Sequence, residues 1–287
     1  MSLAANSSAL TAEGTSAYRE QVEEAASALP SLPSSPAVGI LHDTALNHLL
    51  DAETTEDTLP CARIPHLPTS EGTLTTGILD GTPVVELDQH MHLYDGHTPR
   101  EVTFPIRMLA TAGVDTLLLT ATAGSVRPQF ERGTLMLLTD HINFQGQNPL
   151  VGPNVSDWGP RFPDMTEPYD SHLLQAAGTA ARSQGISLQK GIYMGVLGPN
   201  EATAAEHRMA RRLGADAVGT TVVPEVIAAR HMDLQVMAVT VLTNQHLTGD
   251  GPPASTDHGT DVQTARARLH RLLTEVVTRM NPDGTST

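Results

Sequence analysis

The hydrophobic pattern between residues 214 and 244 predicts two strands with a helix between them. The first strand is a short apolar run, Ala215–Val218. Pro224 then marks the start of the helix, because the N–H that proline lacks would be unpaired at that position anyway. The second strand, Leu234–Val241, contains the unbroken apolar run Val236–Val239, which favours burial on both faces. Together they predict a βαβ unit.

Polar residues follow both strands of this predicted unit. Thr220 and Thr221 come after the first strand, and Thr243 and Asn244 come after the second. Ligands of open α/β sheets bind at the carboxyl ends of the strands. We therefore expect these residues to contribute to a binding site.

The rest of the chain alternates predicted helices with predicted strands. Helices are predicted over Ala12–Leu29, Thr44–Ala52, Thr98–Thr111, Tyr169–Gln184, Glu201–Leu213 and from Asp257 or Thr260 to near Met280. Strands are predicted over Ala37–Leu41, a hairpin across Gly72–Gln89 that turns at Asp80-Gly81, Asp115–Thr122, Thr134–Ile142 and Ile186–Leu197. A long Gly/Pro/Asn loop, Asn143–Glu167, is expected to be functional or interfacial. This alternation predicts an α/β sandwich with a central mixed sheet.

Composition narrows the class of protein. The chain has 287 residues, which is enough for one large α/β domain or two small ones, and its hydrophobic content of 39% is enough for a buried core. We divide it into an N-terminal helix with a Ser/Pro linker, residues 1–36, and one domain, residues 37–287. Cys61 is the only cysteine, which excludes an internal disulfide framework and favours a cytoplasmic enzyme.

Charge and hydropathy restrict the partners. The formal net charge of −15 argues against a nucleic-acid partner and means that any anion site must be built locally. No apolar run approaches the length that a bilayer requires, and the N-terminus lacks a signal pattern, so we expect no membrane partner. A small molecule is the expected ligand.

Several longer motifs together resemble one known family, the trimeric purine nucleoside phosphorylases. The motifs are LGADAVG (Leu213–Gly219), VPEV (Val223–Val226), HLYDG (His92–Gly96), VTFPIRML (Val102–Leu109) and DHINFQGQNPL (Asp140–Leu150). The resemblance runs from roughly residue 37 to the C-terminus. It implies a nucleoside phosphorylase-type three-layer sandwich. It also implies cleavage of the N-glycosidic bond of a nucleoside, with phosphate as the nucleophile.

The resemblance implies an anion site that holds phosphate under the reacting sugar carbon. Thr44, His92 and Thr221 match its ligands by position. His90 stands where the family has an arginine, and His90, His92 and Asn244 are our catalytic candidates. The glycines that surround the anion in the family are missing around Thr44. The anion site is therefore expected to be altered.

The sugar site and the assembly are also expectations from the resemblance. Tyr94 and His258 match the family's sugar contacts, and Thr220 replaces a methionine that packs on the sugar. The resemblance implies a homotrimer in which a neighbouring subunit lends a side chain to each site. Phe162 and Trp158 in the long loop are the candidate donors.

The base site departs from the family pattern. Asn244 matches the asparagine that contacts the leaving base, and Thr122 replaces a small apolar residue beside the base. Glu201 stands one residue before the position of the family's base-binding glutamate, which is Ala202 here. The resemblance implies no cofactor, with phosphate as the possible co-substrate.

The altered sites leave three functions open. The first is a pentosyltransferase acting on a nucleoside or a related glycosylated heterocycle. The second is the same scaffold redirected to phosphate-independent acid/base chemistry on another small molecule in specialised metabolism. The third is a non-catalytic binding homologue. A metal site is not expected: His90 and His92, two apart in a predicted strand, would share a face but lack a third ligand.

Overall fold

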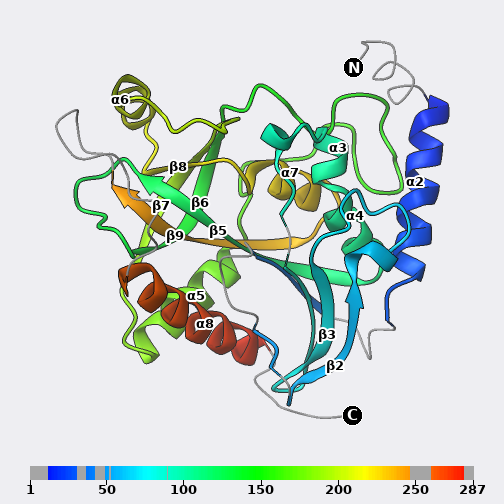
Figure 1. Ribbon diagram of the computed structural model, residues 1–287, viewed down its shortest axis with the longest axis horizontal. Helices are drawn as coiled ribbons and strands as arrows, with labels where there is room; N and C mark the ends of the chain where they lie inside the picture. The colour runs from blue at the N-terminus through cyan, green and yellow to red at the C-terminus, as the bar shows by residue number, and fades with distance from the viewer. Residues whose placement is uncertain are drawn as a thin grey trace.

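A central mixed sheet with helices on both faces organises the computed structural model, which describes residues 12–30, 37–42, 49–51, 53–88, 90–245 and 260–280 (Figure 1). Within these ranges nine strands form one sheet, in the order β2-β3-β4-β1-β5-β8-β7-β6-β9. Strand β9 also pairs with β5. The strands from β5 to β9 therefore close into a ring, and β1 to β4 extend from it.

The strand bounds and directions explain the mixed character of the sheet. The strands are β1 (Ala37–Leu41), β2 (Thr55–Pro60), β3 (Thr73–Leu79), β4 (Thr82–Leu87), β5 (Val114–Ser125), β6 (Leu135–Asn143), β7 (Leu188–Gly195), β8 (Ala217–Gly219) and β9 (Gln235–Gln245). Strands β4, β1, β5 and β9 run parallel to one another. Strands β6, β7 and β8 are mutually parallel and run against β5 and β9. The predicted α/β fold with a mixed sheet is confirmed.

Two layers of helices cover the sheet. The helices are α2 (Ala12–Ser27), α3 (Pro99–Val102), α4 (Phe104–Thr111), α5 (Ser171–Ser183), α6 (Ala204–Arg212), α7 (Val223–His231) and α8 (Thr260–Met280). Helices α5 and α8 pack on one face, and α4 and α7 pack on the other with α2 outside them (Figure 1). Short 3-10 turns cover Cys61–Arg63 and Leu93–Asp95. The result is the expected three-layer arrangement.

Local sequence signals account for several boundaries. The hairpin between β3 and β4 turns at Asp80 and Gly81, whose φ angles are 47° and 79°, as its two-residue turn requires. Thr98 caps α3 through a capping box with Glu101. The helix predicted over Thr98–Thr111 is divided into α3 and α4 at Thr103, because the proline in the first turn of α4 cannot continue a helical hydrogen-bond ladder.

Other sequence predictions were wrong. The unit from β8 to β9 is not a parallel βαβ unit, because β8 has only 3 residues and pairs antiparallel with the end of β5, while β9 is parallel to β5. Strand β2 was not predicted, because its sequence TEDTLP is polar and mostly exposed, as an edge strand allows. The predicted helix over Thr44–Ala52 is not helical at residues 49–51, and its other residues lie outside the described ranges.

The N-terminal helix is packed against the body of the fold. Tyr18 of α2 contacts Phe104 of α4 edge-to-face, with ring centroids 5.9 Å apart. The division at residue 36 stays a prediction. No helix in the described ranges is long and apolar enough to cross a membrane.

Candidate active site

Several segments that carry predicted site residues converge where β5, β7, β8 and β9 meet. Gly124 near the end of β5 pairs with Val218 on one side and with Asn244 on the other. Gly195 at the end of β7 pairs with Gly219 at the end of β8. The turn after β8, which holds Thr220 and Thr221, therefore starts beside the ends of the other strands. The polar residues predicted after β8 and β9 come together, although the two strands run in opposite directions.

Gly198, after β7, packs against two of the predicted sugar contacts. Its φ is 71°, a conformation that suits glycine. A Cβ at this position would lie 2.9 Å from Thr220 Cγ2 and 3.3 Å from Tyr94 Cδ1. The structure therefore brings Tyr94 and Thr220 to the same place from segments far apart in the sequence. The third sugar candidate, His258, lies outside the described residues.

His92 and Tyr94 form the wall of the site contributed by the segment after β4. Their rings are stacked, with centroids 4.5 Å apart and planes inclined by 13°. Strand β4 ends at Leu87, so His90 and His92 are not on a strand, and the expected common face does not apply. The strand prediction extended too far because Asp88 and Gln89 continue without a turn signal.

His90 is held by protein groups on both sides of its ring. Its Nδ1 lies 2.7 Å from Glu225 Oε1 in α7, and its Nε2 lies 3.0 Å from the backbone oxygen of Thr120 in β5. The ring is buried. This arrangement links the segment after β4 to α7, and it was not visible in the sequence because the partners are 135 and 30 residues away.

Thr221 lies in a buried and strained turn. Its backbone N–H donates to the hydroxyl of Tyr193, 3.3 Å away, and the residue is 8% exposed. The next residue, Val222, has a φ of 70°, which is rare for a β-branched side chain. Glu225 Oε2 accepts a hydrogen bond of 2.5 Å from the Val222 N–H. Strain of this kind is common at functional sites.

The predicted base contacts differ in their settings. Thr122 and Asn244 lie on the paired strands β5 and β9, and both are half-buried. Glu201 is exposed and precedes α6, whose N-cap is Thr203. The acidic residue in the first turn of α6 is Glu206, which completes a capping box with Thr203. The helix predicted from Glu201 therefore starts later, at Ala204, and the T-x-x-E pattern of Thr203–Glu206 is the sequence signal that could have placed its start.

Glu86 is a buried carboxylate that the sequence did not single out. Glu86 Oε1 accepts from the Leu49 N–H at 2.6 Å, and Oε2 accepts from the Leu50 N–H at 3.0 Å. His42 Nε2 lies 3.9 Å from Glu86 Oε1. Glu86 thus joins the two residues that flank positions 43–48, where Thr44 occurs. Thr44 itself lies outside the described residues.

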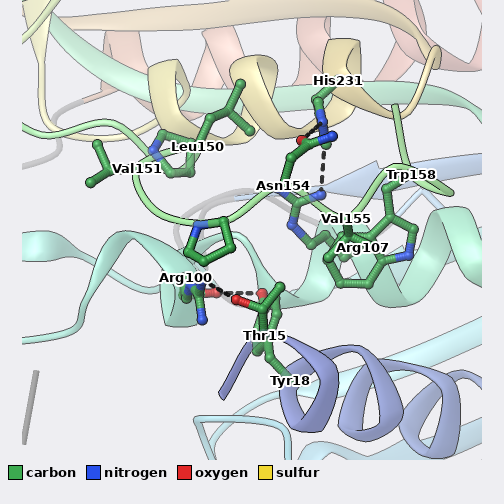
Figure 2. Close-up of a pocket in the computed structure, with 12 residues that line it drawn as sticks. Thr15, Tyr18, Arg100, Arg107, Leu150, Val151, Asn154, Val155, Trp158 and His231 are labelled. Atoms are coloured by element: carbon green, nitrogen blue, oxygen red, sulfur yellow. Dashed lines mark hydrogen bonds between the residues drawn. The ribbon is translucent and has the colours of Figure 1, made fainter. Parts of the chain in front are cut away.

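A small hollow, shown in Figure 2, is lined by residues that include Arg107, Trp158 and His231. Its volume is ≈ 20 Å³. The guanidinium of Arg107 stacks on Trp158 at 4.6 Å and contacts His231 Nδ1 at 3.3 Å. His231 Nε2 in turn lies 3.0 Å from Asn154 Oδ1. Trp158 is therefore engaged within its own chain, whereas Phe162 is 87% exposed.

Among the described residues, no group of three or more His, Cys, Asp and Glu side chains could hold a metal ion.

Comparisons with known proteins agree with one another. Residues 39–278 match the model of the phosphorylase superfamily. Purine nucleoside phosphorylase 1 of Bacillus subtilis is 40% identical over 232 residues, which cover 79% of this chain and 86% of that protein. The bovine purine nucleoside phosphorylase is 40% identical over 238 residues, covering 79% and 82% of the two chains. The crystal structure of a Schistosoma purine nucleoside phosphorylase with hypoxanthine has a TM-score of 0.81 and 30% identity, over 91% of this chain and 96% of that chain.

Proposed function

Because this chain belongs to the purine nucleoside phosphorylase family of the phosphorylase superfamily, we propose that it is a pentosyltransferase that cleaves the N-glycosidic bond of a purine nucleoside with phosphate. The observation that carries the proposal is the 40% identity to a purine nucleoside phosphorylase across 86% of that protein's length. The convergence of Tyr94, Gly198 and Thr220 supports it. The redirected and non-catalytic alternatives have no such support.

The proposed reaction exchanges one bond to the sugar for another. A phosphate oxygen forms a bond to C1′ while the bond from C1′ to the base nitrogen breaks. The electron pair of that bond leaves with the base, and the products are the free base and a sugar 1-phosphate. Charge develops on the leaving base and on the sugar, so preorganised hydrogen-bond donors are expected to contribute most to the rate.

The nucleophile site in this proposal consists of Thr44, His92 and Thr221. Hydroxyl groups and one imidazole would hold the phosphate. His90 would not bind phosphate directly, because Glu225 and Thr120 occupy its ring nitrogens. Weak phosphate binding is expected, since a fixed guanidinium is missing from this set.

The remaining candidate residues form the proposed sugar site and the proposed base site. Tyr94, Thr220 and His258 would hold the sugar. Asn244, half-buried at the end of β9, would donate a hydrogen bond from its amide to the leaving base. Thr122 on the neighbouring strand would line the base. Glu201 is exposed, so its contact with a base would require a bound ligand to draw it inward.

The proposed assembly is a homotrimer in the cytoplasm, without a cofactor other than the co-substrate phosphate. The exposed ring of Phe162 supports its assignment as the side chain lent to a neighbouring subunit. Trp158 is a weaker donor, because it stacks on Arg107 of its own chain.

A nucleoside panel tests the proposed function. Inosine, guanosine, adenosine and uridine are incubated with the purified protein in phosphate buffer and in a phosphate-free buffer of equal ionic strength. Base release is measured by chromatography. We expect release of a purine only with phosphate. Release that does not depend on phosphate would indicate hydrolysis, and binding without release would indicate a non-catalytic homologue; both results contradict the proposal.

A further inference from the structure

Glu225 is a buried carboxylate that serves two segments at once. It is 1% exposed and lies in the first turn of α7. One oxygen accepts the Val222 N–H at 2.5 Å, and the other lies 2.7 Å from His90 Nδ1. Burying a carboxylate is costly unless hydrogen bonds and an opposite charge compensate for the lost water. Glu225 has both kinds of partner only if His90 is charged.

With Glu225 as a carboxylate, the contacts of His90 suit a ring that carries a proton on each nitrogen. Nδ1 faces a carboxylate oxygen, and Nε2 faces the backbone oxygen of Thr120 at 3.0 Å. Both of these groups are acceptors. A neutral imidazole can donate from only one nitrogen, whereas the imidazolium donates from both. The doubly protonated ring therefore satisfies both partners, and it supplies the positive charge that Glu225 faces.

The turn before α7 has an unfavourable backbone conformation that needs such support. Val222 has a φ of 70° and a ψ of −51°. Such a conformation costs free energy in a β-branched residue and persists only where other interactions impose it. The hydrogen bond from its N–H to Glu225 imposes it here. Thr221 is the preceding residue, so its orientation depends on the same bond.

We propose that Glu225 and His90 form a positioning pair that fixes the segment carrying His92 relative to the turn carrying Thr221. Glu225 contacts His90, which lies two positions before His92. It also accepts the N–H of Val222, which follows Thr221. This inference rests on the proposed function, in which His92 and Thr221 bind the phosphate. His90 then acts through other residues, not as a phosphate ligand or a proton carrier.

The test uses two variants of the pair, their combination and a matched control. Glu225→Gln and His90→Gln each remove one charge and retain a side chain of similar length. Glu206→Gln is the control, because Glu206 accepts the same kind of capping bond, from the Thr203 N–H at 2.6 Å, but is exposed to solvent, whereas Glu225 is buried. The intact protein is used throughout, and its melting temperature is recorded for each variant.

Steady-state kinetics provide the first measurement. We expect each variant of the pair to raise the KM for phosphate roughly 10- to 100-fold, the range for a lost hydrogen bond between charged groups. The KM for the nucleoside should change much less. The double variant should behave like either single variant, because the two side chains act as a unit. Glu206→Gln should match the wild type. An unchanged phosphate KM in a folded Glu225→Gln or His90→Gln variant would overturn the proposal, as would additive effects.

Hydrogen–deuterium exchange provides a second measurement that needs no activity. The amides of residues 220–223 should exchange faster in Glu225→Gln and in His90→Gln than in the wild type or Glu206→Gln. Equal exchange rates would overturn the proposal. If the wild type cleaves no nucleoside, the proposed function fails, and exchange alone decides whether the pair holds the turn. If Glu225→Gln does not fold, His90→Gln tests the same link from its other end.

Discussion

The ring of His92 lies stacked on the ring of Tyr94, with centroids 4.5 Å apart and planes inclined by 13°. Tyr94 also lies beside Gly198, as does Thr220. One aromatic ring therefore orients a proposed phosphate ligand on one side and borders the proposed sugar site on the other. Tyr94 therefore links the proposed phosphate site to the proposed sugar site.

Two substitutions of Tyr94 separate these roles. Tyr94→Phe retains the stacked ring and removes only the hydroxyl, so it should raise the KM for the nucleoside and leave the KM for phosphate close to the wild-type value. Tyr94→Ala also removes the stacking partner of His92, and it should raise the KM for phosphate about tenfold, given the usual worth of an aromatic pair. Initial rates over a grid of both substrate concentrations measure the two constants. Equal phosphate constants in the two variants would contradict the connection.

Replacement of Gly198 by a larger residue is predicted to destabilise the fold unless Thr220 moves or becomes smaller. In Gly198→Ala, the new Cβ would lie 2.9 Å from Thr220 Cγ2, and the φ of 71° would also be unfavourable. We expect a loss of about 2 kcal/mol in the free energy of unfolding, measured by urea denaturation. Adding Thr220→Ser removes the methyl group that clashes, so the double variant should recover the steric part and keep the conformational part. No recovery in the double variant would show that this contact is not the source of the cost.

The stability of the fold should depend on pH through His231. Burial, and then the nearby Arg107 cation, lower the pKa of His231 to about 4, whereas an unfolded chain has a value of about 6.5. The unfolded state therefore binds a proton at pH values where the folded state does not. The contribution of His231 to stability should be fully present above about pH 6.5 and should be lost as the pH falls towards 4.

Urea denaturation at several pH values tests the titration of His231. The wild type should lose more free energy of unfolding between pH 6.5 and pH 4 than His231→Gln, which cannot titrate and can still contact Asn154. The comparison isolates His231 from the carboxylates that titrate in the same range. Parallel curves for the two proteins would contradict the assigned pKa.

Alanine substitutions of Phe162 and Trp158 are predicted to differ in their effect on the free energy of unfolding. Phe162 is 87% exposed, so Phe162→Ala should change the free energy of unfolding by less than about 0.5 kcal/mol and should lower the catalytic rate if the ring serves a neighbouring subunit. Trp158 packs on Arg107 and Tyr18, so Trp158→Ala should cost about 2 kcal/mol. Denaturation, turnover and analytical ultracentrifugation measure these effects. A monomeric wild type would contradict the trimer.

Much of the fold could be predicted from the sequence because its signals are local. The Asp80-Gly81 turn, the Thr98 cap and the apolar run of β1 each depend on a few neighbouring residues. Strand β2 could not be predicted in this way, since an exposed edge strand needs no hydrophobic face. The antiparallel direction of β8 also escaped prediction, because 3 residues carry no information on strand direction.

The candidate site was predictable only in part, because some of its contacts join residues that are far apart in the sequence. Resemblance to a family indicated Tyr94, Thr220 and Asn244, which the fold brings to one region. It gave no indication that His90 would be paired with Glu225, because that contact spans 135 residues and involves a position where the chain departs from the family. Long-range polar pairing appears in the structure and not in the hydrophobic pattern.

The central claim is that phosphate attacks the sugar carbon of a purine nucleoside. Phosphorus-31 NMR of the wild-type protein with phosphate and the preferred purine nucleoside tests it most directly, because the claim requires a new phosphate ester. The account predicts a sugar 1-phosphate resonance that grows in step with release of the purine, at one ester per base. Release of the purine with no new phosphorus resonance, or no change in either, would contradict it.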